Sequence, residues 1–269
     1  MVTVDQLPAG ALALGSELAH LRRALADTTY PRLNKIALFD PRTLHYRFVQ
    51  ALPDGSFDFR AGCGHSLLAC VVADGRPGPV TVRAVTTGDR VLCEREREPD
   101  GDSYTLSFLK PPGAPGTLPT GRPVDLLLGV PVSLVRYGNP YVFVDRRHLP
   151  EGDLQGQLAA LRAQAARLLG HPPTSALPKI AAISVQDGGL SVRALTVGGW
   201  HPRLALTGAA ALAAAGAISG TVVPPVRGPV RTPASTVTVS AAHDRVRVHH
   251  KRAEVLETLE LPWRIHATA

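Results

Sequence analysis

The chain has 269 residues, 45% of them hydrophobic, with a formal net charge of +7 and a pI of about 9.8. This length provides for two domains with sizeable cores, and this hydrophobic content excludes disorder of the chain as a whole. Basic residues are scattered and aromatic residues make up only 5%, so we expect no nucleic-acid partner, because such surfaces combine clustered charge with stacking rings. A modest positive field suits small anionic ligands better.

We also expect no membrane partner and no secretion signal. No apolar run reaches the roughly 18 residues that a membrane helix needs, and the first residues, MVTVDQLPAG, carry an acid and no basic leader. Cys63, Cys70 and Cys93 show neither a Cys-x-x-Cys pair nor zinc-ligand spacing. A reduced, cytoplasmic protein without a metal is therefore predicted.

The first part of the chain is predicted to contain short strands and two helices. A helix is expected over 16–26, because Ser16 is a suitable N-cap and the leucines that follow fall on one side. Turn residues and apolar runs predict strands over 33–40, 45–50, 80–96 and 103–109.

Between these strands, residues 61–75, AGCGHSLLACVVADG, carry a cysteine between two glycines and then a nearly all-apolar run. Glycine permits a sharp backbone entry, and a helix that is apolar on every side must be enclosed by other structure. Cys63 is therefore predicted at the N-terminus of a buried helix, where the amides of Gly64, His65 and Ser66 lack intrahelical partners and favour an anion. Such a position can lower the pKa of a thiol; the alternative is that Cys63 is a small core residue.

The second part of the chain begins after a connector rich in proline and glycine at 110–123. Residues 124–145 are predicted to form two strands interrupted near Gly138-Asn139-Pro140, and 154–169 an amphipathic helix ended by Gly170. Strands are expected at 178–184 and 190–196, and a second all-apolar helix is expected within 201–220. Strands or extended segments are expected at 221–226, 235–240 and 245–250, and a short helix followed by a strand at 251–263.

An internal repeat relates the two parts at an offset of 144 residues. NKIALFD (34–40) falls on PKIAAIS (178–184), Cys63 on Thr207 and Gly64 on Gly208. The order of elements also agrees, which predicts a duplication with two pseudo-symmetric halves. Each half is expected to wrap a curved sheet around its buried helix, with both helix N-termini converging on one cleft.

These pieces resemble PrpF-type isomerases of the diaminopimelate epimerase-like superfamily. NKIALFD, the Gly-Cys-Gly start at 62–64, YGNPYVFVD (137–145), LPKIAAIS (177–184) and HPRLALTGAAALAAA (201–215) occur in the family's order. The resemblance implies an α+β fold of two halves, each a β-barrel-like sheet around a central helix. We expect a first half over 1–128, a second over 129–250, and a segment over 251–269 that can return to the first half.

The resemblance also implies a cofactor-free isomerase that moves a double bond in an unsaturated carboxylate. Its acid/base pair corresponds to Lys35 and Cys63, although the lysine here follows Asn34 rather than a serine. The residues predicted to bind substrate are Gly64, His65, Ser66, Asn139, Thr207, Gly208 and Ala209. Moving a proton along an unsaturated carboxylate needs a base, an acid and a partner for the transient charge.

Two departures from the family bear on the substrate. The family's first strand and its Gly/Ser-rich carboxylate-binding loop are not found before residue 30, and RAEVLETLE (252–260) stands where an Arg-Thr-Ala-Arg-like segment is expected. A tricarboxylate of the propionate pathway is therefore disfavoured. Shortened PrpF-like isomerases assigned to 4-alkyl-L-proline precursors of lincosamide, pyrrolobenzodiazepine and hormaomycin-type antibiotics are the preferred branch.

Several alternatives stay open. Lys35 can be a surface lysine at a strand end, His65 a helix cap and Asn139 a turn residue, while Lys179 is the repeat mate of Lys35. Thr207 cannot supply the second thiolate with which an epimerase inverts a stereocentre, so an epimerase or tautomerase of small carboxylates is only an alternative, as is a non-catalytic binding or accessory protein. An uncovered sheet edge could be paired in a homodimer.

The remaining cysteines and histidines are given structural roles. Cys70 and Cys93 are expected in the core, and His201 as a signal for a helix start. The run HHKR at 249–252 is expected to be a solvated strand end rather than a metal site, because no carboxylate or cysteine stands beside it at ligand spacing.

Overall fold

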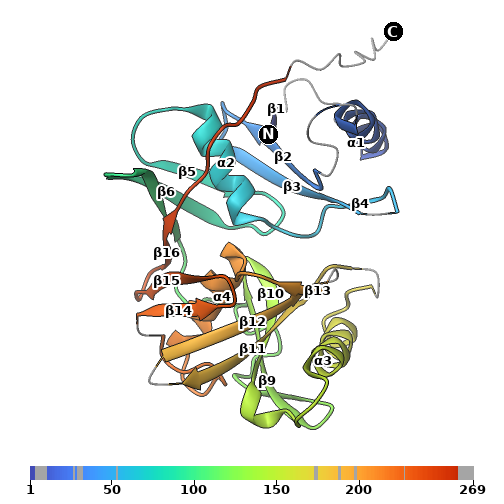
Figure 1. Ribbon diagram of the computed structural model, residues 1–269, viewed down its shortest axis with the longest axis vertical. Coiled ribbons are helices and arrows are strands. Elements are labelled where there is room, and N and C mark those ends of the chain that lie inside the picture. The colour runs from blue at the N-terminus through green and yellow to red at the C-terminus, as the bar shows by residue number, and fades with distance from the viewer. Residues whose placement is uncertain are drawn as a thin grey trace.

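The computed structural model describes residues 1–3, 11–26, 28, 33–52, 54–172, 175–186, 189–196, 199–226 and 228–259. The chain forms two halves stacked along the long axis, with the N-terminal elements in one half and the later elements in the other (Figure 1). The expectations for residues 260–269 lie outside the described residues.

The first half consists of two helices and seven strands among the described residues. Its helices are α1 (Ala11–Ala26) and α2 (Gly64–Asp74), and its strands are β1 (Val2–Thr3), β2 (Lys35–Asp40), β3 (His45–Ala51), β4 (Phe57–Asp58), β5 (Val80–Ala84), β6 (Arg90–Glu98) and β7 (Gly101–Phe108). The helix α2 ends at Gly75, whose left-handed backbone donates to the carbonyl of Val71.

The second half continues from the connector. Its helices are η2 (Arg146–His148), α3 (Leu154–Leu168) and α4 (Leu206–Ala217), and its strands are β8 (Asp125–Leu127), β9 (Val130–Tyr137), β10 (Asn139–Asp145), β11 (Lys179–Gln186), β12 (Gly189–Thr196), β13 (Gly199–His201), β14 (Pro229–Thr232), β15 (Ser235–Ala241) and β16 (Val246–Lys251).

The pairing of strands repeats between the halves. In the first half β1 runs parallel to β2, β2 antiparallel to β3, β3 parallel to β5 and β5 antiparallel to β6. The second half repeats this pattern with β10, β11, β12, β14 and β15. The antiparallel pair of β7 and β16 joins both sets into one continuous sheet. An identical sequence of pairings supports the predicted duplication.

The repeat also identifies β1 as the counterpart of β10. Only two residues pair, however, Val2 with Leu38 and Thr3 with Phe39, whereas β10 pairs five residues with β11.

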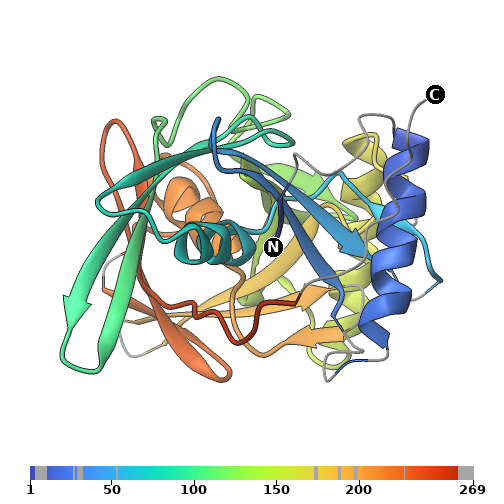
Figure 2. The same ribbon diagram turned by 90° about the horizontal axis from the view of Figure 1, so that it is seen from above.

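The central helices lie inside the curved sheets, and α1 and α3 lie outside. One cluster of buried residues contains the apolar residues of both α2 and α4, and ten consecutive residues of α4 are buried. Separate apolar clusters join α1 to β2 and β3, and α3 to the strands of the second half. Figure 1 shows α2 in one half and α4 in the other, and the two helices contact each other where the halves meet. In the view from above both lie inside the surrounding strands (Figure 2).

Some predicted boundaries were wrong. Residues 124–145 form three strands rather than two, because the backbone turns at Leu128 and Gly129, both with positive φ. Residues 221–226 form bends without a strand, and 252–259 form neither the predicted helix nor a strand. This last segment instead runs extended from β16 along the first half (Figure 1).

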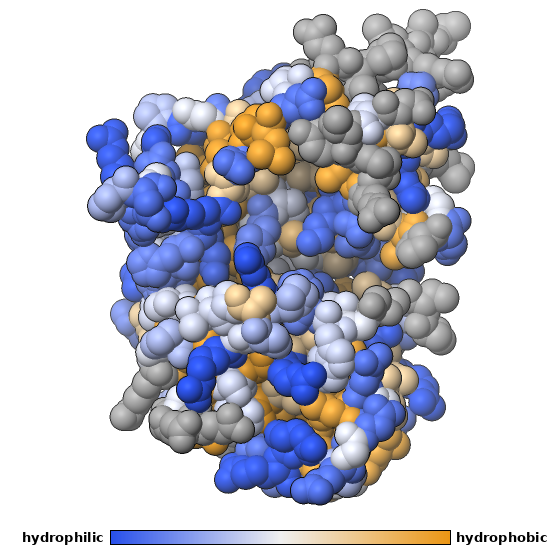
Figure 3. Space-filling view, viewed as in Figure 1, coloured by the Kyte–Doolittle hydropathy of each residue, from blue (hydrophilic) through white to orange (hydrophobic). Residues whose placement is uncertain are grey.

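Among the described residues, no helix combines the length and the apolar character that crossing a membrane requires. Figure 3 shows hydrophilic residues over much of the boundary between the two halves on one face of the molecule.

Candidate active site

The N-termini of α2 and α4 meet at the boundary between the halves. A Cβ atom added to Gly64 would lie 2.4 Å from Cδ2 of Leu206, so glycine permits this close approach. Neither helix has a side-chain cap at its N-terminus, where Cys63 and Ala205 occupy the N-cap positions. By contrast, Asp153 caps α3. The first-turn amides of the two central helices are therefore left to a ligand or to water.

The first turn of α2 agrees with the prediction, whereas the first turn of α4 differs from it. The amide of Leu67 donates to the carbonyl of Cys63, which leaves the amides of Gly64, His65 and Ser66 in the first turn of α2, as predicted. In α4 the amide of Ala209 donates to the carbonyl of Ala205. Ala209, which was predicted to bind substrate, therefore has no free amide to offer, because the helix begins at Leu206 and its first turn ends at Gly208.

Cys63 is held by hydrogen bonds to its backbone. The hydroxyl of Tyr46 donates to the carbonyl of Cys63 at 2.9 Å, and Ser66 Oγ contacts both that carbonyl, at 3.2 Å, and Tyr46 Oη, at 2.7 Å. The Cys63 residue is half-buried, whereas Cys70 and Cys93 are buried. Burial raises the pKa of each buried thiol to about 12, so Cys63 is the thiol placed for chemistry.

Asn139 is completely buried and joins the two halves. Its Oδ1 accepts from the amide of Gly62 at 2.6 Å, and its Nδ2 donates to the carbonyl of Gly62 at 2.9 Å. Nδ2 also lies 3.3 Å from Thr207 Oγ1. The side-chain amide predicted to bind substrate is therefore engaged by the protein, where it positions the residue before Cys63.

Thr207 occupies the position in α4 that corresponds to Cys63. It is buried, and its hydroxyl contacts Asn139 and hydrogen-bonds with Tyr141. Gly208 is needed beside it, because a Cβ atom there would lie 2.5 Å from Tyr141 Oη. Thr207 and Gly208 are thus at the boundary as predicted, with the threonine hydroxyl already bonded to protein groups.

Two hollows lie next to these helix N-termini. One encloses about 310 Å³ of space between atoms, part of it open, and is lined mostly by apolar groups together with Cys63 and Thr207. The other encloses about 200 Å³, and its lining includes Lys179, His201 and Tyr141. Lys35 is exposed at the start of β2 and lines neither hollow.

Basic side chains converge on this region. Burial lowers the pKa of Lys179, the Cys63 thiol opposes this shift, and Lys35 adds to it. Burial lowers the pKa of Lys251 as well, with a contribution from Arg203. Partial desolvation lowers the pKa of His65, and Lys251 and Lys35 lower it further. Mutual repulsion of this kind requires the basic groups to be neighbours. They therefore create a positive field around the two hollows beside the N-termini of α2 and α4, which together are called the crevice.

His201 is the other ionisable group of the second hollow. Desolvation lowers its pKa, and its Nδ1 accepts a hydrogen bond from the amide of Arg203 at 3.1 Å. This bond assigns the proton of the neutral ring to Nε2. The sequence predicted only a helix-start signal for His201 and did not predict its place in the second hollow. It also did not predict the roles of Tyr46, Tyr141, Arg203 and Lys251 in the site.

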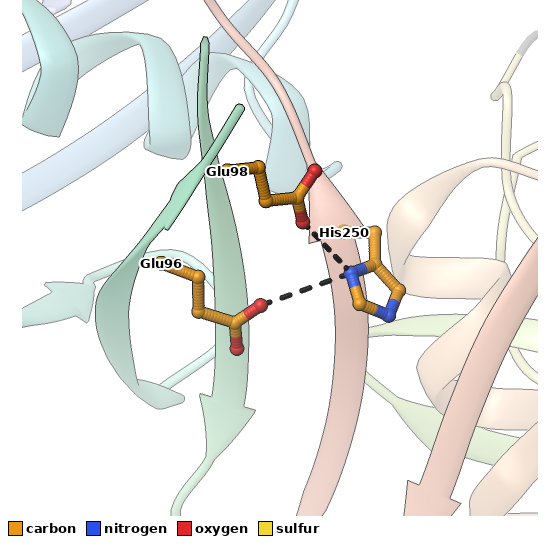
Figure 4. A group of neighbouring side chains, drawn as sticks. All are labelled: Glu96, Glu98 and His250. Atoms are coloured by element: carbon orange, nitrogen blue, oxygen red, sulfur yellow. Dashed lines mark hydrogen bonds and ion pairs between the residues drawn. The ribbon is translucent and has the colours of Figure 1, made fainter. Parts of the chain in front are cut away.

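Glu96 and Glu98 on β6 lie beside His250 on β16 (Figure 4). Nδ1 of His250 is 3.2 Å from Glu98 Oε1 and 3.7 Å from Glu96 Oε2, and the three groups offer ligand atoms within 4.8 Å of one another. The spacing of residues in the sequence did not indicate these carboxylates, because they come from a strand distant in sequence. Arg252 already pairs with Glu98 at 2.7 Å, so this group is a charge network on the surface.

The chain is similar in fold to several solved structures. A methylitaconate-delta-isomerase matches with a TM-score of 0.64 and 20% identity over 93% of this chain and 88% of that chain. A hydroxyproline epimerase from Agrobacterium vitis with bound trans-4-hydroxy-L-proline matches with a TM-score of 0.54 and 15% identity, covering 88% and 77% of the two chains. A probable proline racemase from Agrobacterium radiobacter K84 matches with 0.53 and 15%, covering 89% and 81%.

These matches confirm the predicted fold class, an α+β fold of the diaminopimelate epimerase-like type with two similar halves. No family model matches the sequence, and no curated protein does so either.

Proposed function

We propose that this chain is a cofactor-independent isomerase of the PrpF type that shifts a C=C double bond by proton transfer in an unsaturated carboxylate. The observation that carries the proposal is the half-buried thiol of Cys63, set where two uncapped helix N-termini meet and where basic side chains converge. The likeness in fold to a methylitaconate-delta-isomerase supports double-bond transposition as the reaction.

The proposed reaction uses the site in three ways. A base removes a proton next to the unsaturated system, the electrons move along the conjugated atoms, and an acid returns a proton at the far end. Negative charge that develops on the carboxylate is stabilised by the first-turn amides of α2 and α4 and by the basic side chains. Cys63 and a lysine form the proton-transfer pair, for which the family resemblance indicates Lys35.

The charge of the crevice bears on the substrate. The groups that act electrostatically on His65 are all basic, namely Lys251, Lys35, His201 and Arg203. Such surroundings favour a ligand with net negative charge over a zwitterion. For the proposed substrate, an unsaturated precursor of a 4-alkyl-L-proline in secondary metabolism, this favours a form with a neutral ring nitrogen, such as an imine, or with a second carboxylate.

The experiment compares three probes in deuterated buffer: methylitaconate, a 4-alkylidene pyrroline carboxylate and trans-4-hydroxy-L-proline. We expect one of the two unsaturated acids to take up solvent deuterium by NMR and to change its ultraviolet absorbance as the double bond moves. Cys63→Ala is expected to abolish both signals, whereas Cys70→Ala, checked for native circular dichroism, keeps them. Deuterium uptake by hydroxyproline alone, with inversion of its stereocentre, would instead favour an epimerase.

A second candidate is a ligand-binding accessory protein without turnover. The exposed position of Lys35 is the observation that favours it, because an exposed lysine at a strand end is a poor proton-transfer group. Calorimetric binding of an unsaturated acid, without deuterium uptake over long incubation, would support this candidate and reject the isomerase.

A further inference from the structure

Lys179 is the lysine that lines the second of the two hollows, next to the N-terminus of α4, whereas Cys63 lines the first. Resting on the isomerase activity proposed above, we propose that Lys179 of the second half, rather than Lys35, exchanges a proton with the substrate across from Cys63 of the first half, and that His201 donates a hydrogen bond to the charge that develops between them.

The two lysines begin equivalent strands but have different surroundings. Lys179 pairs with Tyr141 in the parallel register of β10 and β11, and it lines the second hollow with Tyr141 and His201. Its counterpart Lys35 is exposed. The reason lies in the neighbouring strand: β10 extends alongside β11 to Lys179, whereas the two described residues of β1 pair only with Leu38 and Phe39.

The use of lysine in this chain supports a chemical role. Only four of its 29 basic residues are lysines, and three of them, Lys35, Lys179 and Lys251, belong to the group of charges around the crevice. The fourth, Lys110, pairs with Asp89 at 2.7 Å. Arginine holds anions as well as lysine does but cannot release its proton near neutral pH. A site that needed only positive charge could have used arginine.

Nothing in the described structure fixes Lys179 in its charged form. Among the described residues no carboxylate lies within ion-pair distance of its Nζ, although Asp or Glu partners are found for Lys110, for seven arginines and for one histidine. Burial and the nearby charge of Lys35 favour the neutral amine, and together they outweigh the Cys63 thiol, which favours the ammonium. A neutral amine is the form that accepts a proton.

The proposed step balances as a proton shift along three carbon atoms. Lys179 Nζ takes the proton from carbon, and the electrons of that C–H bond form the new C=C bond. The electrons of the old C=C bond take a proton from Cys63 Sγ at the far carbon. The Nε2–H of His201 donates to the substrate oxygen that carries charge in between. The resulting ammonium and thiolate return to amine and thiol by proton exchange through solvent.

The first test needs no substrate. Reductive methylation with ¹³C-formaldehyde labels the four lysines, and Lys179→Arg identifies the Lys179 signal by NMR. We expect this signal to titrate below that of free dimethyl-lysine, and its titration to move when Cys63 is changed to Ser. A titration at or above the free value, unaffected by Cys63→Ser, would overturn the inference whatever the enzyme's activity.

The second test measures turnover of whichever probe, methylitaconate or the 4-alkylidene pyrroline carboxylate, the wild-type protein isomerises. Lys179→Arg is expected to lower kcat by about 100-fold or more, the usual loss of a general base, whereas the matched control Lys110→Arg loses less than tenfold. Added ethylamine is expected to rescue Lys179→Ala but not Cys63→Ala. A 100-fold loss in Lys35→Arg with an active Lys179→Arg would assign the base to Lys35 and refute the proposal.

These outcomes separate the inference from the function on which it rests. A wild-type protein that isomerises neither unsaturated probe counts against the proposed function, while the titration still decides whether Lys179 is a proton-exchanging amine. An active wild-type protein with normal Lys179 variants leaves the function standing and removes Lys179 from it.

Discussion

The hydrogen bonds of Asn139 give a direct test of how the two halves are held together. Changing Asn139 to Leu keeps the number of side-chain heavy atoms but removes its bonds to the amide and carbonyl of Gly62, at 2.6 and 2.9 Å. Thr207 keeps Tyr141 as a partner, so two backbone groups lose their partners. Each unsatisfied buried group costs about 1–3 kcal/mol. Because Gly62 is half-buried, we take the lower part of the range and expect a loss of about 2–4 kcal/mol.

Urea unfolding followed by circular dichroism measures this loss. With an m-value of about 3 kcal/mol/M, the midpoint should fall by about 1 M. Gln50→Leu is a matched control, because the side-chain amide of Gln50 also donates to two backbone carbonyls, of Asn34 and Ala51, but is only half-buried, whereas Asn139 is completely buried. The control should cost less than about 1 kcal/mol. If Asn139→Leu costs no more than Gln50→Leu, Asn139 does not connect the halves as argued.

A companion variant, Asn139→Asp, separates the donor from the acceptor. The carboxylate can still accept from the Gly62 amide but faces the Gly62 carbonyl without a proton to donate. Burial raises the pKa of such an acid in the folded state, and protonation restores a donor. The destabilisation relative to wild type should therefore be largest at neutral pH and decrease as the pH falls through that raised pKa.

Three further predictions concern the thiols, the glycines and the histidines. At about pH 8 one thiol of the native protein should react with Ellman's reagent and all three after denaturation, since burial raises the pKa of Cys70 and Cys93 to about 12; a second fast-reacting native thiol would contradict this. Gly208→Ala should lower the free energy of unfolding by about 1–3 kcal/mol, because the added Cβ would collide with Tyr141. Gly15→Ala in α1 should raise it by about 0.5–1 kcal/mol, because the added Cβ there meets nothing. Equal thermal shifts of the two variants would refute the packing argument. Finally, His65 and His201 have lowered pKa values in the folded protein, so the unfolded chain binds more protons. The free energy of unfolding should therefore decrease as the pH falls below about 6.5. Urea titrations that show no such slope, or the same slope in the His65→Gln/His201→Gln variant, would contradict this prediction.

The sequence predicts the scaffold well because the central helices carry their own signals. Both α2 and α4 are apolar around their whole circumference, which requires enclosure, and the glycine beside Cys63 marks where α2 begins. The repeat then predicts the second half from the first. The split between β8 and β9 was missed because Leu128 adopts a positive φ, which nothing about leucine suggests.

The chemistry of the crevice is predicted less well, because it depends on contacts between residues far apart in the chain. Asn139 forms hydrogen bonds with Gly62, which lies 77 positions away in the chain. Lys251 reaches the crevice only because β16 pairs with β7. A signal for the basic residues was nevertheless present: lysine is rare in this arginine-rich chain, so each lysine deserved separate consideration as a titrating group.

The duplicated scaffold therefore supports an asymmetric site. A symmetric pair of thiols would suit inversion of a stereocentre, but Thr207 stands where the second thiol would be, and its hydroxyl is bonded within the protein. A symmetric pair of lysines is absent as well, since Lys179 lines a hollow beside Tyr141 whereas Lys35 is exposed. What remains is one thiol from the first half and one recessed amine from the second. Two unlike groups on opposite sides of one ligand can remove a proton at one carbon and return another at a different carbon, which moves a double bond and leaves no need for a second thiol.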